Sequence, residues 1–92
     1  MIQKVLDYTK LGKPINAYIL VDVDYNLHYE ALKKISAMRF VQDAVAVTGP
    51  NDMLIKAIVN DAEELGDFVL KKLKSIPGVR KTETLLVLET AK

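Results

Sequence analysis

The stretch FVQDAVAVTGPNDMLIKAIVN, residues 40–60, decides how this chain folds. Its two halves are apolar runs rich in valine and isoleucine, which favour strands at about 40–48 and 53–60. The four residues between these runs, Gly49 to Asp52, are typical turn formers. Because a connection of four residues fits an antiparallel hairpin, the middle of the chain is predicted to be a β-hairpin.

A strand and a helix are predicted before this hairpin, and a helix and a strand after it. Residues 17–24 (AYILVDVD) alternate in the manner of a strand, and residues 26–38 carry apolar side chains at helical spacing. Asp61 is expected to cap the second helix, since Glu64 follows it three residues later in a capping-box pattern. Residues 79–90 form the last predicted strand.

The order strand–helix–strand–strand–helix–strand is the ferredoxin-like βαββαβ pattern. The sequence therefore predicts an α+β sandwich in which right-handed crossovers give a four-stranded antiparallel sheet of order 4-1-3-2, with both helices on one face. Residues 15–92 would form this domain. Residues 1–14 are expected to be an extra N-terminal segment, a short strand followed by a linker.

Composition excludes several classes of function. The 92 residues make one small domain, with no cysteine and a single histidine, so disulfides, thiolate chemistry and a metal centre are not expected. A net charge of +1 does not indicate the basic surface that direct DNA binding usually requires. Because no apolar run approaches the roughly 20 residues of a membrane span, we expect a soluble protein. The absence of cysteine fits the cytoplasm, and no cofactor is expected.

In such a fold one face of the sheet is left bare, and here both faces look apolar. A bare apolar face would exceed the few hundred Å² that a monomer usually exposes. We therefore expect a second copy to cover it and form a two-fold homodimer, unless residues 1–16 cover it instead. The predicted interface residues are Tyr18, Leu20, Ala44, Ala46, Leu54, Ile58 and Leu88, and Leu86 is expected on the same face.

The hairpin loop also carries groups that could bind a ligand. Gly49 admits close approach of a ligand, and the N–H groups of Asn51, Asp52 and Met53 are expected to be free. These donors could hold a carboxylate while the Asp52 carboxylate pairs with an ammonium group, which would suit an amino acid. The alternative is that Asp52 stabilises the turn with its own side chain.

Two threonines of the last strand could contribute to the same function. Thr82 and Thr84 alternate along the strand, so they point the same way and could hydrogen-bond a polar ligand. The alternative is that threonine is simply a good strand former.

Four short motifs, taken in order, resemble the effector (RAM) domain of the Lrp/AsnC transcription regulators. The resemblance covers about residues 11–92. The motifs are Leu11-Gly12-Lys13-Pro14 with Ala17, Thr48-Gly49-x-x-Asp52-x-Leu54, Ile76-Pro77-Gly78-Val79, and Thr82-x-Thr84-x-x-Val87-x-Glu89.

This resemblance implies an amino-acid effector bound between dimers, with assembly into homodimers and octamers. It further implies that Gly49 and Asp52 form the ligand loop and that Asn51, at a variable position, affects the choice of ligand. The response region would be Thr82, Thr84, Leu85 and Leu86. In the 4-1-3-2 order we expect the loop to lie near the end of the last strand, some 20 Å from Thr82 at about 3.3 Å per residue. A site that used both would then have to be shared between subunits.

The resemblance departs from the family at the N-terminus. Full-length members carry a winged helix-turn-helix there, whereas only Met1 to Lys10 precede Leu11, so we expect a stand-alone effector domain or a shortened form. The leading hypothesis is a non-enzymatic amino-acid sensor that self-assembles and could join full-length regulators. The alternatives are a pure assembly module and a small dimeric α+β-barrel enzyme, which would need a closed pocket holding His28 or Tyr18.

Overall fold

The structure is a computed structural model that describes residues 14–49 and 51–91. The strand and linker predicted within residues 1–13, their suggested cover of the sheet, and Pro50 lie outside the described residues. The elements are β1 (Ile15–Val23), the 3₁₀ turn η1 (Tyr25–Leu27), α2 (His28–Ser36), β2 (Val41–Ala46), β3 (Met53–Val59), α3 (Ala62–Asp67), the π-helical η2 (Phe68–Leu73) and β4 (Val79–Leu86).

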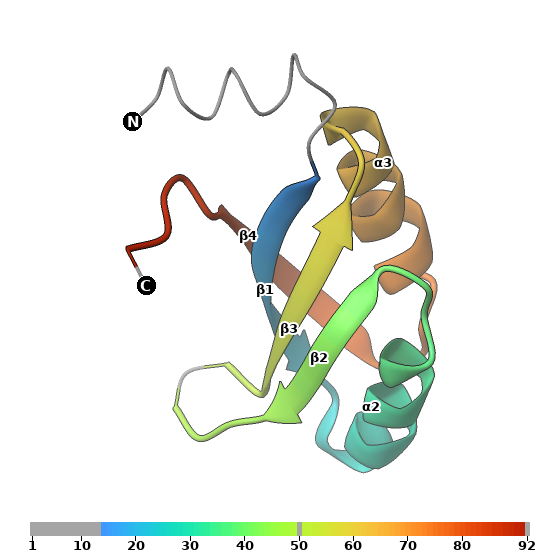
Figure 1. The fold of residues 1–92 in the computed structure, drawn as a ribbon. Coiled ribbons are helices and arrows are strands. Elements are labelled where there is room, and N and C mark those ends of the chain that lie inside the picture. The colour runs from blue at the N-terminus through green and yellow to red at the C-terminus, as the bar shows by residue number, and fades with distance from the viewer. Residues whose placement is uncertain (1–13, 50, 92) are drawn as a thin grey trace.

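The four strands are antiparallel and lie in the order β2-β3-β1-β4, which is the predicted order read from the other edge. Both helical segments cover the same face of the sheet (Figure 1). The predicted ferredoxin-like α+β fold is therefore confirmed. β2 and β4 are shorter than predicted, because the ladder between β2 and β3 ends at Ala46 and that between β1 and β4 ends at Leu86.

The hydrophobic core lies between this face and the helices. Every second residue of β1 and β3 is buried, as the period of two requires for a sheet with one covered face. The Phe68 ring is fully buried and meets Phe40 edge to face at 6.1 Å between ring centroids. The core side chains include Ile19, Val21, Ala31, Ile35, Met53, Ile55, Ala57, Phe68, Leu73 and Ile76.

The predicted side-chain directions of β2 are wrong. After Val41 the β2–β3 ladder shifts register, so that Gln42 is an extra residue without a partner on β3. A shift of one residue sends every later side chain to the opposite face. Ala44 and Ala46 consequently pair with buried residues of β3 on the helix-covered face, and Val45 lies on the other face.

The predicted directions in β4 are also wrong. Leu86 pairs with the buried Ala17 and so lies on the helix-covered side, whereas Leu85 pairs with Tyr18 on the other face. Alternation identified which residues share a face, but both sets in this strand are apolar, so composition could not say which face was which. Leu88 follows the end of β4 and is about half exposed, at 49%.

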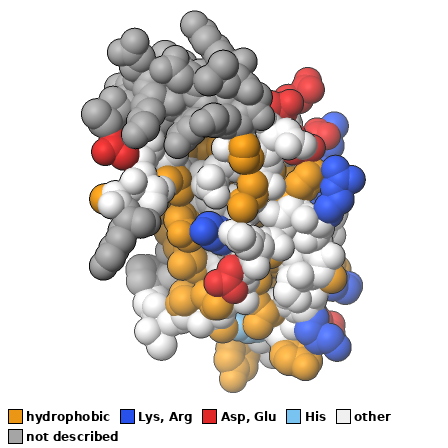
Figure 2. Space-filling model, viewed as in Figure 1, with side chains coloured by type: hydrophobic (Ala, Val, Ile, Leu, Met, Phe, Trp, Pro, Cys, Tyr) orange, Lys and Arg blue, Asp and Glu red, His pale blue; other side chains and the backbone are white. Residues whose placement is uncertain are grey.

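The face away from the helices is called the open face here. Figure 2 shows hydrophobic side chains gathered over the sheet, with both signs of charge among them. Lys56 lies among these residues, with its Nζ 5.9 Å from the centroid of the Tyr18 ring. By register, the apolar residues of the open face are Tyr18, Leu20, Val45, Leu54, Ile58 and Leu85.

The predicted cap of the second helix is confirmed. Asp61 has extended backbone angles, and its Oδ1 accepts a hydrogen bond from the Glu64 N–H at 2.8 Å. The Glu64 carboxylate reaches back to the N–H of Asn60 at 2.7 Å, one residue before the usual partner of a capping box.

We expect Asp61→Ala to lower the free energy of unfolding by about 1 kcal/mol, because an N–H of the first turn loses its acceptor. Urea unfolding followed by circular dichroism measures this loss. The matched control is Glu63→Ala, which removes a carboxylate from the same first turn but neither capping bond. Equal losses in the two variants would show that charge near the helix start, and not the cap, matters here.

Candidate functional site

The hairpin loop brings Asp52 against the end of β1. The Asp52 N–H donates to the Val21 carbonyl at 3.1 Å, and the Asp52 carbonyl accepts from the Val47 N–H at 3.0 Å. The Asp52 carboxylate accepts a hydrogen bond from the Val23 N–H through Oδ2 at 2.9 Å. The expectation that the Asp52 N–H is free is therefore wrong, because this group joins the loop to β1.

The rest of the loop is held in the same region. The side-chain amide of Asn51 donates from Nδ2 to Oδ1 of Asp22 at 3.0 Å. Gly49 has φ of 120°, a conformation that L side chains rarely adopt. Among the described residues, none comes within 4 Å of the position a Gly49 Cβ would take. Backbone conformation, rather than crowding, accounts for glycine there.

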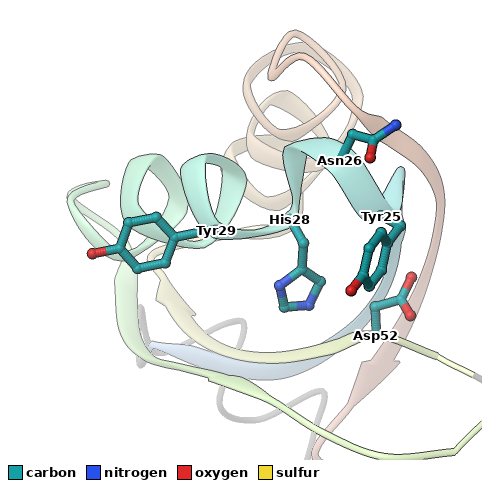
Figure 3. Close-up of a pocket in the computed structure, with 5 residues that line it drawn as sticks. All are labelled: Tyr25, Asn26, His28, Tyr29 and Asp52. Atoms are coloured by element: carbon teal, nitrogen blue, oxygen red, sulfur yellow. The ribbon is translucent and has the colours of Figure 1, made fainter.

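Asp52 also lines an open pocket together with Tyr25, Asn26, His28 and Tyr29 (Figure 3). These four residues belong to η1 and the first turn of α2, and Oδ1 of Asp24 accepts from the Asn26 N–H at 3.0 Å to start that turn. Figure 3 shows the Tyr25 and His28 side chains pointing to the strand side, where Asp52 lies, while Asn26 points away.

The pocket is rich in polar and aromatic groups. It combines a carboxylate, an imidazole and two phenol rings, so it can accept and donate hydrogen bonds and can stack on a planar group. It is also open, because Tyr25 is 89% exposed and Tyr29 is 70% exposed. Pockets for small ligands usually bury about 70–90% of the ligand, so a ligand held here would need a further surface to cover it.

The topology places Thr82 at the same end of the sheet as the loop. Thr82 pairs with Val21, whose carbonyl also accepts from Asp52, so both residues flank the same position of β1. Two strand spacings separate them, or about 10 Å. The predicted separation of about 20 Å is wrong, because β3 and β4 both run antiparallel to β1 and begin at the same end.

Thr82 and Thr84 lie on the same side of β4, as predicted, and Leu86 lies there too, whereas Leu85 of the response region lies on the open face. Thr82, Thr84 and Leu86 pair with buried residues of β1 on the helix-covered side, yet Thr84 and Leu86 are exposed there. Leu86 lies furthest from the loop, at the end of the ladder. The structure therefore brings Asp52 and Thr82 near each other and leaves Leu86 at a distance.

Three residues of the pocket escaped prediction, namely Tyr25, Asn26 and Tyr29, and His28 was considered only for the enzyme alternative. They lie more than twenty residues before Asp52 in the chain, so no local pattern connects them to the loop. The available signal was the fold order itself, since the end of the first strand and the start of the third must meet at one edge of the sheet.

Residues 14–49 and 51–91 contain neither a metal-binding cluster nor a membrane-spanning helix. No group of three or more histidine, cysteine, aspartate or glutamate residues there is arranged to hold a metal ion. No helix of this part of the chain has the length and hydropathy needed to cross a membrane.

The fold and the pocket define a small α+β domain with an open sheet face and an open pocket lined in part by Asp52. The chain belongs to the Lrp/AsnC ligand binding domain family, whose model matches residues 16–92.

Among curated proteins, the chain is similar to the HTH-type transcriptional regulator FL11 of Pyrococcus horikoshii. The two are 34% identical over 88 residues, which cover 96% of this chain and 58% of FL11. The chain spans about half the length of the curated relatives it matches, which are named as HTH-type transcriptional regulators.

Solved structures share the fold. TTHA0845 from Thermus thermophilus is 32% identical with a TM-score of 0.80, over 85% of this chain and 98% of its own. The regulator NMB0573 of Neisseria meningitidis, solved as an L-Met complex, is 24% identical with a TM-score of 0.82, over 92% of this chain and 56% of its own. The second likeness concerns the fold alone.

Proposed function

We propose that this chain is a non-enzymatic, amino-acid-binding effector domain of a transcription regulator family. The observation that carries the proposal is that Asp52 of the G-x-x-D loop lies in the wall of an open pocket at the edge of the sheet. Asp52 belongs to the loop that the family resemblance assigns to the ligand, and it is the residue of that loop that lines the pocket. Membership of a ligand binding domain family supports the same function.

The chemistry of the pocket suits an amino acid. A zwitterion needs hydrogen-bond acceptors for its ammonium group, donors for its carboxylate and room for its side chain, and the five lining residues offer both donors and acceptors. The proposed ligand residues are the ones predicted from the sequence. They are Gly49, Asn51 and Asp52 in the loop, and Thr82, Thr84 and Leu86 on β4.

Self-assembly is the second part of the proposal. The open face carries apolar side chains that a partner sheet would remove from water, and a two-fold homodimer is the simplest arrangement that does this. A neighbouring dimer in an octamer could then cover the open pocket. Mixed assembly with full-length regulators in the cytoplasm would use the same contacts. The full-length partner would then contact DNA, since this chain is nearly neutral.

The test is a thermal-shift screen of the twenty amino acids, with light scattering on each sample. An amino acid at 100 times its dissociation constant should stabilise the protein by about 2.7 kcal/mol, a clear rise in Tm. Tyr25→Ala should reduce this rise, whereas Leu70→Ala, another exposed apolar residue, should leave it unchanged. If no amino acid raises Tm while the protein still assembles, the chain is an assembly module and not a sensor.

No specific observation favours the enzyme alternative. It requires a closed pocket, whereas His28 lines an open one. Tyr18 lies in the middle of the open face, beside Lys56, and is not among the residues that line the His28 pocket.

A further inference from the structure

We infer that Asp52 is a positioning residue whose carboxylate holds the backbone of Val23 and thereby shapes the pocket wall formed by Tyr25 and His28. The inference rests on the proposed function, because it assigns Asp52 a role within the same amino-acid site. It differs from the expectation that the Asp52 carboxylate pairs directly with the ammonium group of the ligand.

The Val23 N–H has a side-chain acceptor and no partner in the ladder of β3. The ladder between β1 and β3 ends where Val21 pairs with Met53, the first residue of β3. The N–H of Val23, two residues further along β1, therefore lies beyond the start of β3. Oδ2 of Asp52 accepts from this N–H at 2.9 Å. A side-chain carboxylate thus takes the place that a backbone carbonyl would have in a longer strand.

The chain leads from Val23 through Asp24 into the turn that lines the pocket. The Asp24 N–H donates to the Gly78 carbonyl at 2.8 Å, and the Asp24 carbonyl accepts from the Leu27 N–H at 2.9 Å. The side chain of Asp24 accepts from the Asn26 N–H. Val23 is therefore followed directly by Asp24, whose own hydrogen bonds hold the turn that presents Tyr25 and His28.

The hydrogen bond to Val23 limits what the Asp52 carboxylate can offer a ligand. Oδ2 of Asp52 is committed to a backbone N–H next to a core side chain, since Val23 is only 2% exposed. Tyr25 and His28, by contrast, present their side chains on the wall of the open pocket. These two side chains, set in place by Asp52, are then groups that contact the amino acid in the pocket that Asp52 also lines.

Two substitutions separate positioning from charge pairing. Asp52→Asn removes the charge but keeps an oxygen that can accept from the Val23 N–H, whereas Asp52→Ala removes both. In Asp52→Ala we expect hydrogen exchange of the Val23 amide to speed up by about tenfold or more, because a buried donor loses its acceptor. The NMR signals of Tyr25 to Tyr29 should also shift. Asp52→Asn should restore both readouts nearly to those of the unaltered protein.

The binding arm uses an equimolar mixture of the twenty L-amino acids, followed by thermal shift and NMR. Asp52→Ala should weaken amino-acid binding, measured by the rise in Tm and the NMR shifts, about tenfold. Asp52→Asn should bind like the unaltered protein. Val59→Ala serves as the matched control, because it destabilises the fold by truncating a buried side chain at the far end of β3. It should lower Tm without moving the Tyr25 to Tyr29 signals.

Two results would overturn the inference. If Asp52→Asn loses the response as fully as Asp52→Ala, the charge itself contacts the amino acid. If Asp52→Ala leaves Val23 exchange and the pocket signals unchanged relative to Val59→Ala, the carboxylate positions nothing. If the mixture does not raise the Tm of the unaltered protein, the proposed function fails. Hydrogen exchange of Val23 and the NMR signals of Tyr25 to Tyr29 still decide the role of Asp52.

Discussion

Replacing Leu54 with lysine is expected to weaken association between two copies of this chain by about 100-fold or more. In a two-fold dimer each substitution occurs twice, and burying one leucine contributes about 1.5–3 kcal/mol. Losing both contributions removes about 3 kcal/mol or more, and each 1.4 kcal/mol is tenfold in the dissociation constant. Lysine ammonium groups left in an apolar interface would add a further cost.

The position of Leu54 explains the choice. Leu54 pairs with Leu20 on one neighbouring strand and with Val45 on the other, so it lies within the apolar row that crosses the open face. It is half-buried in the single chain, and its side chain is not part of the helix-covered core. The substitution should therefore affect assembly much more than folding.

Light scattering over a range of protein concentrations measures the effect. The matched control is Leu70→Lys, the same chemical change at a leucine of η2 that is 66% exposed on the helical side. The control should assemble like the unaltered protein. Should Leu54→Lys assemble equally well while circular dichroism shows a normal fold, the open face is not the interface.

Replacing Gly78 with alanine is expected to have the largest effect on stability, lowering the free energy of unfolding by about 2–5 kcal/mol. Gly78 has φ of 97°, a conformation that costs a residue with a Cβ about 1–2 kcal/mol. An added Cβ would also lie 2.8 Å from the Leu27 Cβ and 3.4 Å from the Val23 Cγ1. Crowding of this kind costs about 1–3 kcal/mol more.

The consequence is large for so small a domain, since total stabilities are about 5–15 kcal/mol. Urea unfolding gives the loss, and Gly49→Ala is the matched control. Gly49 also has positive φ, but no described residue comes within 4 Å of its Cβ position, so only the backbone strain applies. If the two variants lose the same stability, the contact between Gly78 and Leu27 is unimportant.

Sequence patterns predicted the elements of this fold and their order. Alternation identified β1 and β3, and the capping pattern at Asp61 identified the start of α3. These features depend on interactions between residues a few positions apart, so they can be read from one segment at a time. The sheet order followed from general rules on the handedness of connections.

The candidate site was predicted only in part. The hairpin loop was identified from its turn residues, and Asp52 does line a pocket. The other lining residues, Tyr25, Asn26 and Tyr29, come from a segment more than twenty residues away. Their meeting with Asp52 depends on how β1 and β3 are aligned, which no local pattern specifies.

The sequence by itself determined that this chain forms a βαββαβ domain with a turn at 49–52 and a capped second helix, because period and capping act within a single element. Tertiary structure alone decided which face the apolar side chains of β2 and β4 occupy. One extra residue at Gln42 moved Ala44 and Ala46 to the core side, since strand pairing transmits a single shift along the whole remaining strand. Tertiary structure also decided that the Asp52 carboxylate meets the Val23 N–H, because the two residues are 29 positions apart in sequence and are brought together only by the sheet.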